Sequence, residues 1–324
     1  MKLSMKRIRL LLIILLSGVM ITGCNVAEDL TDCDVELELA FRFMKGGTDQ
    51  FGAEVSSLDV FIFDDQGQFI RRLVETDRSK FDENYRMRIT LPPGQYNFIT
   101  WGGLNSTQYS YPMSASQFQG ATFTDEMEAA TSKVIDRGGI VDYHPSDMFY
   151  GNRLDVVLVM ERRKETILTD LVKNSTRINL KATGLPLPTR ANVFTNLDFS
   201  FYAANGSYDY YNHISHVNPG TTLKYNALDE SSDANDIYYS SFYTFRLVFD
   251  EDNSLVIWDK ENNKSFYTGD VLDEFIRKDS RYDTQAKVDA EDVFNIELSF
   301  HGYTLVSVKL NGWDVQISNP GPIY

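Results

Sequence analysis

Apolar and polar residues alternate along much of this chain. In residues 35–43 every odd-numbered position is apolar, and charged residues stand at three of the even-numbered positions between them. A period of two residues is typical of a β-strand with one buried face. The same alternation returns in residues 85–91 and 176–182. The pattern therefore predicts a protein built mainly of β-strands.

Turn-forming residues separate neighbouring strand-like runs at residues 64–67, 205–206, 250–253 and 301–302, and we predict a hairpin at each place. Glycine and asparagine in these segments readily adopt the positive φ angles that tight hairpin turns need. A further turn is predicted at Pro92, Pro93 and Gly94, between the runs 85–91 and 96–101. Proline cannot donate to a strand ladder, and glycine tolerates positive φ.

Residues 270–278 are the best helix candidate, because their apolar residues recur at helical spacing after Asp270, which can cap a helix. Residues 105–150 show little alternation and predict a long connection with short helices. The charged segment 161–165 predicts a domain boundary. We therefore expect an all-β protein of two tandem Greek-key β-sandwiches, residues 34–165 and 166–324, with a few short helices in connections.

Composition agrees with folded β domains and argues against one class of partner. Apolar residues make up 43% of the 324 residues and aromatic residues 13%, and large flat side chains favour pleated sheets. The chain has 31 basic and 46 acidic residues, a formal net charge of −15. Because nucleic-acid binding needs a basic surface, we expect no nucleic-acid partner.

The first 23 residues have the parts of a lipoprotein signal peptide. Basic residues at positions 2, 6, 7 and 9 precede an apolar run over residues 10–21, too short for the about 20 residues that span a bilayer. The run ends in Ile-Thr-Gly-Cys24, which resembles the lipobox of bacterial lipoproteins, where the cysteine is acylated and becomes the new N-terminus. We predict a lipid on Cys24, a tether over residues 24–33 and no other cofactor. The alternative is an ordinary cleaved signal with an incidental cysteine.

Cleavage before Cys24 changes the charge and leaves few thiols. The mature chain keeps 27 basic residues against 46 acids, so its net charge is −19. Without a basic patch for an anionic membrane, attachment depends on the acyl chains. Cys33 is then the one remaining thiol in the sequence, so we expect no disulfide within the chain.

Sequence motifs for catalysis or metal binding are weak. The chain has no G-x-S-x-G, P-loop, G-x-G-x-x-G or H-E-x-x-H motif. His213 and His216 could share a metal, but no cysteine or third histidine stands near them. An acidic cluster could hold calcium, although it lacks the alternation of a calcium loop. Its members are Asp229, Glu230, Asp233 and Asp236. We interpret both groups as solvated loops and predict no metal site.

Two aromatic runs, in residues 208–211 and 238–243, could stack on sugar rings. Aromatic residues that alternate in a β-protein more often form cross-strand pairs in the core. An exposed flat platform would favour glycan binding, and rings buried between sheets would favour a structural role.

The order of several motifs resembles the FimB/Mfa2 family of fimbrial anchor proteins from Bacteroidales. The resemblance covers nearly the whole mature chain and rests on residues 21–24, 33–39, 58–64, 91–104, 147–151, 175–180 and 311–313. It implies two transthyretin-like sandwiches and no enzymatic activity. It also implies a lipid-anchored protein of the outer membrane, at the cell surface, that holds the base of a fimbria and terminates its assembly. The implied partners are fimbrial stalk or accessory pilin subunits.

The resemblance further implies strand exchange, in which a segment of one subunit completes the sheet of its neighbour. Residues 35–43 join Cys24 to everything else, so an anchor that must keep them is better suited to donate a strand than to accept one. The candidate donor is residues 314–324, where Val315 and Ile317 alternate with Gln316 before two prolines. The alternative is an ordinary edge strand with a frayed tail. The alternative function is that of a glycan-binding surface lipoprotein beside an outer-membrane transporter.

Overall fold

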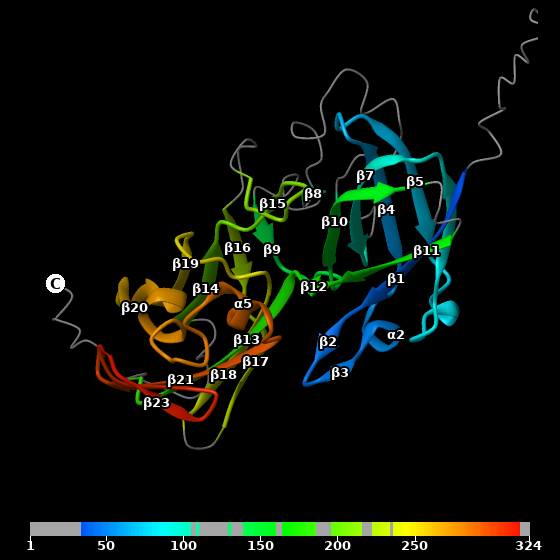
Figure 1. Ribbon diagram of the computed structural model, residues 1–324. Coiled ribbons are helices and arrows are strands. Elements are labelled where there is room, and N and C mark those ends of the chain that lie inside the picture. Colours follow the sequence, from blue (N-terminus) through cyan, green and yellow to red (C-terminus); the bar gives the residue numbers. More distant parts are fainter. Residues whose placement is uncertain are drawn as a thin grey trace, which may run out of the picture.

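The computed structural model describes residues 34–104, 108–109, 129–130, 139–159, 164–185, 196–215, 222–233 and 236–317. Within them the strands form two β-sandwiches in tandem, the first coloured mainly blue to green and the second mainly green to red (Figure 1). The expected all-β class is confirmed. Cys24, Cys33, the predicted signal peptide and the tether lie outside the described residues.

The first sandwich packs a three-stranded sheet against a five-stranded sheet. The smaller sheet has the order β11 (Lys164–Asp170), β1 (Val35–Arg42), β6 (Met87–Leu91). The larger has the order β12 (Val172–Lys173), β10 (Phe149–Leu158), β7 (Gly94–Gly102), β4 (Leu58–Asp64), β5 (Phe69–Glu75). The smaller elements are the hairpin β2 (Met44–Lys45) and β3 (Thr48–Asp49), helix α2 (Phe51–Glu54) and the 3-10 turn η2 (Arg78–Lys80).

Strand β4 is covered on both faces. Val60 and Ile62 belong to the core between the two sheets of the first sandwich, whereas Phe61 and Phe63, on the opposite face of the strand, belong to the larger buried cluster that continues into the second sandwich. All four side chains are fully buried. A strand covered on both faces reads as a continuous apolar run, whereas β1, with one buried face, alternates.

The second sandwich packs a six-stranded sheet against a five-stranded sheet. The first has the order β17 (Leu228–Ser232), β18 (Tyr238–Phe245), β13 (Ser175–Thr183), β21 (Val293–His301), β22 (Thr304–Leu310), β23 (Trp313–Val315). The second has the order β20 (Lys264–Asp270), β19 (Asn253–Asp259), β14 (Leu197–Ala203), β16 (Leu223–Asn226), β9 (Ile140–Val141). The remaining elements are the pair β8 (Ala129–Ala130) and β15 (Ser207–Tyr208), the π-helix η5 (Leu272–Ile276) and helix α5 (Gln285–Asp289).

The core of the second sandwich continues into the first. Trp101 of β7 packs edge-on against Tyr150 of β10, with ring centres 5.0 Å apart, and reaches Tyr208 of β15 at 6.5 Å. The hydroxyl of Tyr150 donates to the backbone carbonyl of Tyr210 at 2.7 Å. The two sandwiches therefore share a buried aromatic contact.

Two predicted hairpins and the predicted helix are confirmed. β4 pairs with β5 and β21 pairs with β22, and Gly67 and Gly302 have φ angles of 75° and 64°. The Asp270 carboxylate accepts the backbone N–H groups of Leu272 at 2.9 Å and Asp273 at 3.0 Å, so it caps η5 as expected.

The strand ends before Pro92 as expected, because β6 ends at Leu91, but the hairpin interpretation is wrong. β6 pairs with β1, whereas β7 pairs with β4 and β10 in the opposite sheet. Gly94 is the first residue of β7 and is not part of the turn. The prolines thus form a corner between two sheets, which the Tyr96 hydroxyl holds by donating to the Pro92 carbonyl at 2.9 Å.

The hairpins predicted at residues 205–206 and 250–253 are also wrong. β14 pairs with β16 and β19, while β15 pairs with β8. β18 and β19 lie in opposite sheets. Asn205 is buried instead of forming an exposed turn: it accepts from the Tyr225 hydroxyl at 2.6 Å and donates to the Arg246 carbonyl at 3.1 Å.

The connection 105–150 and the predicted boundary also differ from expectation. The described parts of the connection include the strands β8 and β9, which pair with strands of the second half. β11 pairs with β1, and β12 pairs with β10, so the pairing of the first sandwich extends to Lys173 rather than ending at residue 165.

Candidate functional site

The predicted donor residues lie at one edge of the second sandwich. Val315 is the last residue of β23 and pairs with Val308 of β22, and Trp313 pairs with Leu310. Val315 and Ile317 are partly buried against the core, whereas Gln316 is exposed. The structure therefore places these residues on a short edge strand and its continuation.

A groove of about 760 Å³ runs beside this edge strand and is lined by residues 278–281 and 313–317. Trp313 has 65% of its surface exposed, the highest value among the described large hydrophobic residues. The Arg281 guanidinium lies 5.4 Å from the centre of the Trp313 ring, and Asp279 accepts from Arg281 Nε at 3.0 Å. An apolar platform and several polar groups thus stand side by side on this surface.

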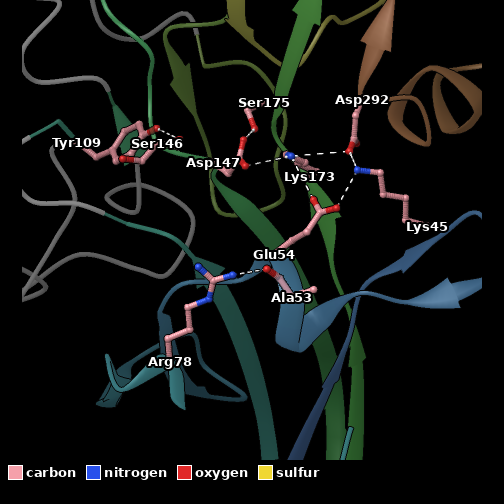
Figure 2. A network of polar contacts seen from close by, with 10 residues as sticks. All are labelled: Lys45, Ala53, Glu54, Arg78, Tyr109, Ser146, Asp147, Lys173, Ser175 and Asp292. Carbon is pink, nitrogen blue, oxygen red and sulfur yellow. Dashed lines mark hydrogen bonds and ion pairs between the residues drawn. The ribbon is translucent and has the colours of Figure 1, made fainter. Parts of the chain in front are cut away.

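A second polar cluster joins the two sandwiches (Figure 2). Lys173 Nζ lies 3.1 Å from Asp147, 3.2 Å from Glu54 and 3.7 Å from Asp292. Lys45 pairs with Glu54 at 2.7 Å and also with Asp292. Because Glu54 follows β3 and Asp292 precedes β21, the two lysines link the β2–β3 hairpin region to the second sandwich. We call these five residues the junction network.

The carboxylates of the junction network outweigh the cost of burying its lysines. Burial alone would lower the pKa of Lys173, but Asp147, Asp292 and Glu54 raise it above its ordinary value. Burial would also lower the pKa of Lys45, but Asp292 and Glu54 raise it above its ordinary value. Both lysines are therefore charged at neutral pH.

A cleft of about 270 Å³ adjoins the junction network. On its far side the Arg177 guanidinium stacks 4.9 Å from the ring centre of Tyr243, and His144 packs on the same ring at 3.7 Å. Sequence reasoning missed the whole region. Its charged residues come from five separate segments. Residues 147–151 and 175–180 carry part of the family resemblance, but no local pattern indicates that these charged side chains meet.

Most rings of the two aromatic runs are buried. Tyr208, Tyr210, Tyr238 and Phe242 have 2% or less of their surface exposed. Tyr211 and Tyr239 are exposed, but they belong to different segments. The runs therefore form parts of the core, as the structural interpretation expected, and not a flat platform.

The candidate metal ligands are dispersed within the described part of the chain. His213 Nδ1 lies 3.4 Å from Asp209, and His216 lies outside the described residues. Asp229 accepts from the Tyr243 hydroxyl at 2.8 Å, and Asp233 accepts from the backbone N–H of Ile237 at 3.1 Å. Among the described residues, no three His, Cys, Asp or Glu side chains gather as metal ligands would.

Membrane attachment must be considered apart from the folded domains. None of the described helices has the length and apolar character that a membrane crossing requires. The predicted lipid site, Cys24, lies outside the described residues.

Comparison with known proteins gives one family and several similar folds. A model of the family described as fimbrillin-A associated anchor proteins Mfa1 and Mfa2 matches residues 30–319. No curated protein sequence matches the chain. The fimbrial anchor protein Mfa2 from Porphyromonas gingivalis has a similar structure, with a TM-score of 0.70 and 18% identity over 88% of this chain and 100% of that chain.

Two structures from Bacteroides thetaiotaomicron are also similar. A candidate polysaccharide-binding protein gives a TM-score of 0.73 and 19% identity over 88% of this chain and 98% of that chain. A candidate adhesin gives a TM-score of 0.70 and 17% identity over 88% and 97%. At these identities the structures establish the two-sandwich fold.

Proposed function

The chain belongs to the family of fimbrillin-A associated anchor proteins Mfa1 and Mfa2, and from this membership we propose that it anchors the base of a fimbria to the outer membrane. It acts at the cell surface, terminates assembly of the fimbria, and has a structural role with no catalytic activity. The proposed partners are stalk or accessory pilin subunits.

The placement of the two chain ends is the observation that best supports this proposal. The described chain begins at β1 in the first sandwich and ends beyond β23 in the second, and these points lie at opposite ends of the molecule (Figure 1). A membrane attachment beside β1 and a fimbrial attachment at β23 would not compete for space.

We propose that acylated Cys24 provides the membrane attachment. The mature charge of −19 offers no electrostatic alternative. Cys24→Ala should release the protein from membranes or leave it as an unprocessed precursor, as measured by fractionation and metabolic lipid labelling. Cys33→Ala is the matched control and should leave processing and attachment intact. A Cys24→Ala protein that is acylated and sediments with membranes would refute the proposal.

We propose that the C-terminal segment around Val315, Gln316 and Ile317 joins the fimbria by strand exchange. β23 has three residues, so few backbone hydrogen bonds hold it to β22. A partner sheet that offers a longer ladder would gain more main-chain bonds than β22 loses. Donation therefore requires little disruption of the second sandwich.

Two truncations test the strand exchange in cells. Deletion of residues 314–324 should leave a folded, membrane-bound protein that sheds fimbriae into the medium. Deletion of residues 318–324 alone keeps Val315–Ile317 and should retain fimbriae. Retention of fimbriae by the folded 314–324 deletion would exclude the donor role.

Glycan binding is the second candidate function, and the exposed indole of Trp313 beside its groove is what favours it. Sugar rings stack on exposed aromatic faces and use nearby polar groups for hydrogen bonds. Calorimetric titration with soluble cell-surface glycans should then show binding that Trp313→Ala abolishes. Binding that is absent, or unaffected by Trp313→Ala, would remove this candidate.

A further inference from the structure

β1 and β11 run in the same direction. Their parallel register extends from Glu36 opposite Lys164 to Arg42 opposite Asp170. The ladder continues one step beyond the strands, because the backbone N–H of Leu171 donates to the Arg42 carbonyl at 2.7 Å. The residue where the chain enters β1 and the residue where it leaves β11 therefore lie at opposite ends of the pair.

Tension on the anchor would act on those two ends. This step rests on the proposed function, in which the membrane holds the chain before Asp34 and a fimbria pulls on it beyond residue 313. The force then enters the first sandwich at the start of β1 and leaves it through β12, which follows β11. We propose that the parallel β1–β11 pair is a mechanical clamp, loaded in shear, that keeps the first sandwich folded while the anchor bears tension.

A strand pair resists shear strongly because the force is shared by all the backbone hydrogen bonds between the two strands at once. A force that pulls two adjacent strand ends apart would instead break these hydrogen bonds one after another. Two ion pairs add to the clamp: Arg42 Nε lies 2.7 Å from Asp170, and Lys164 Nζ lies 2.9 Å from Glu38. The buried row of β1, which includes Leu37 and Leu39, must also leave the core before the strand can slide.

The second sandwich repeats this arrangement. β13, which follows β12 along the chain, is parallel to β21, with Arg177 opposite Val293 and Thr183 opposite Ser299. The load enters β13 at Ser175 and leaves beyond β23, which runs in the same direction as β21 because two antiparallel pairings separate them. Both sandwiches on the path from membrane to fimbria are thus loaded along their strands.

Single-molecule pulling in two directions tests the clamp. The mature chain with Cys24→Ser and Cys33→Ser receives handles on cysteines introduced at residues 34 and 172, which load the pair in shear. A second chain has handles at residues 34 and 164, which are adjacent ends of the pair. The first chain also carries Lys164→Ser and the second Val172→Ser, so that each lacks the same native side chains.

We expect the shear direction to need at least about twofold more force than the other direction at the same pulling rate. Equal or lower force in shear would overturn the proposal. Because purified protein is pulled without fimbriae, this outcome is independent of whether fimbriae are retained on cells.

A glycine substitution in each neighbour of β1 gives a second measurement that does not depend on the handles. Thr166 of β11 and Thr90 of β6 are both exposed and flank β1. Thr166→Gly should shorten the lifetime of the chain pulled from its two ends about fivefold, and Thr90→Gly clearly less, at similar chemical stability. Equal shortening by the two substitutions would show that β1–β11 is not the clamp.

Discussion

Lys173 carries the strongest electrostatic constraint at the scale of single residues. Its side chain is 11% exposed and faces three carboxylates of the junction network. Removing one partner from a buried ionic group leaves the others uncompensated. We expect Lys173→Met to lower the free energy of unfolding by about 3 kcal/mol, as measured by urea denaturation.

An exposed lysine provides the control for this prediction. Lys287 pairs with Asp283 at 2.5 Å, and both side chains are nearly half exposed. Lys287→Met should cost less than about 1 kcal/mol, because water screens such pairs. Equal losses in the two variants would show that the junction network contributes no more than a surface pair.

Asp259 links the fold to pH. Its carboxylate accepts backbone N–H groups of Glu261 and Asn262 at 3.0 Å each, the Asn262 amide at 2.8 Å and the Tyr303 hydroxyl at 2.7 Å. Burial raises the pKa of Asp259, but these hydrogen bonds outweigh burial and hold the pKa below its ordinary value. Its contribution to stability is therefore present above the unfolded pKa of about 3.9 and is lost as pH falls through the lower folded pKa.

Replacement of this carboxylate tests the pH dependence. We expect Asp259→Asn to lower the free energy of unfolding by about 2 kcal/mol at neutral pH, because an amide N–H would face donors. The difference from the native chain should shrink as pH falls below about 4. Asp314→Asn, at a side chain 84% exposed, is the control and should change little at any pH. A difference that stays constant down to acidic pH would contradict this account.

At the scale of elements, Gly103 fixes the end of β7. It has a φ angle of 71°, and a Cβ added there would lie 1.9 Å from the Asp147 carbonyl oxygen. We expect Gly103→Ala to lower the free energy of unfolding by about 3 kcal/mol, as measured by denaturant unfolding. Gly302→Ala shares the positive φ without a neighbour within 4 Å and should cost about 1 kcal/mol. Similar losses of unfolding free energy in the two variants would mean that the backbone at Asp147 can move to make room for the new methyl group.

The sequence predicted strands and turns better than it predicted which strands pair. The sequence predicts the hairpins at Gly67 and Gly302 because each glycine stands in a short polar segment between two strand-like runs. Similar local patterns predict hairpins at Pro92 and Asn205, yet at both places the strand that follows lies in another sheet. A corner and a hairpin both need residues that end a strand, so local chemistry cannot distinguish them.

The residues of the candidate site also differ in whether the sequence predicts them. The alternation of Val315, Gln316 and Ile317 marked them as an edge segment, because that pattern is local. The junction network left no signal, since Lys45 and Lys173 meet the same carboxylates from positions far apart in the sequence. Such a contact exists only after both sandwiches have formed.

At the scale of the whole molecule, the shared aromatic contact should make the two sandwiches unfold together. Trp101, Tyr150 and Tyr208 are buried and come from both sides of the contact. Separating the sandwiches would expose these rings to water. We expect one transition in calorimetry, coincident with the loss of far-ultraviolet circular dichroism. Two separated transitions would show that the contact is weak.

The parallel pairing of β1 with β11 also sets an order of events during synthesis. Arg42 and its partner Asp170 are 128 positions apart, so β1 leaves the ribosome long before β11 exists. Contacts between such distant segments form late, because the entropy of closing a long loop is lost before the contact contributes any stabilising free energy. Until then β1 has β6 as its sheet neighbour and an open backbone edge on its other side. The first of the described strands to be made is thus among the last of them to be completed, and during this interval its open edge can pair with a wrong partner.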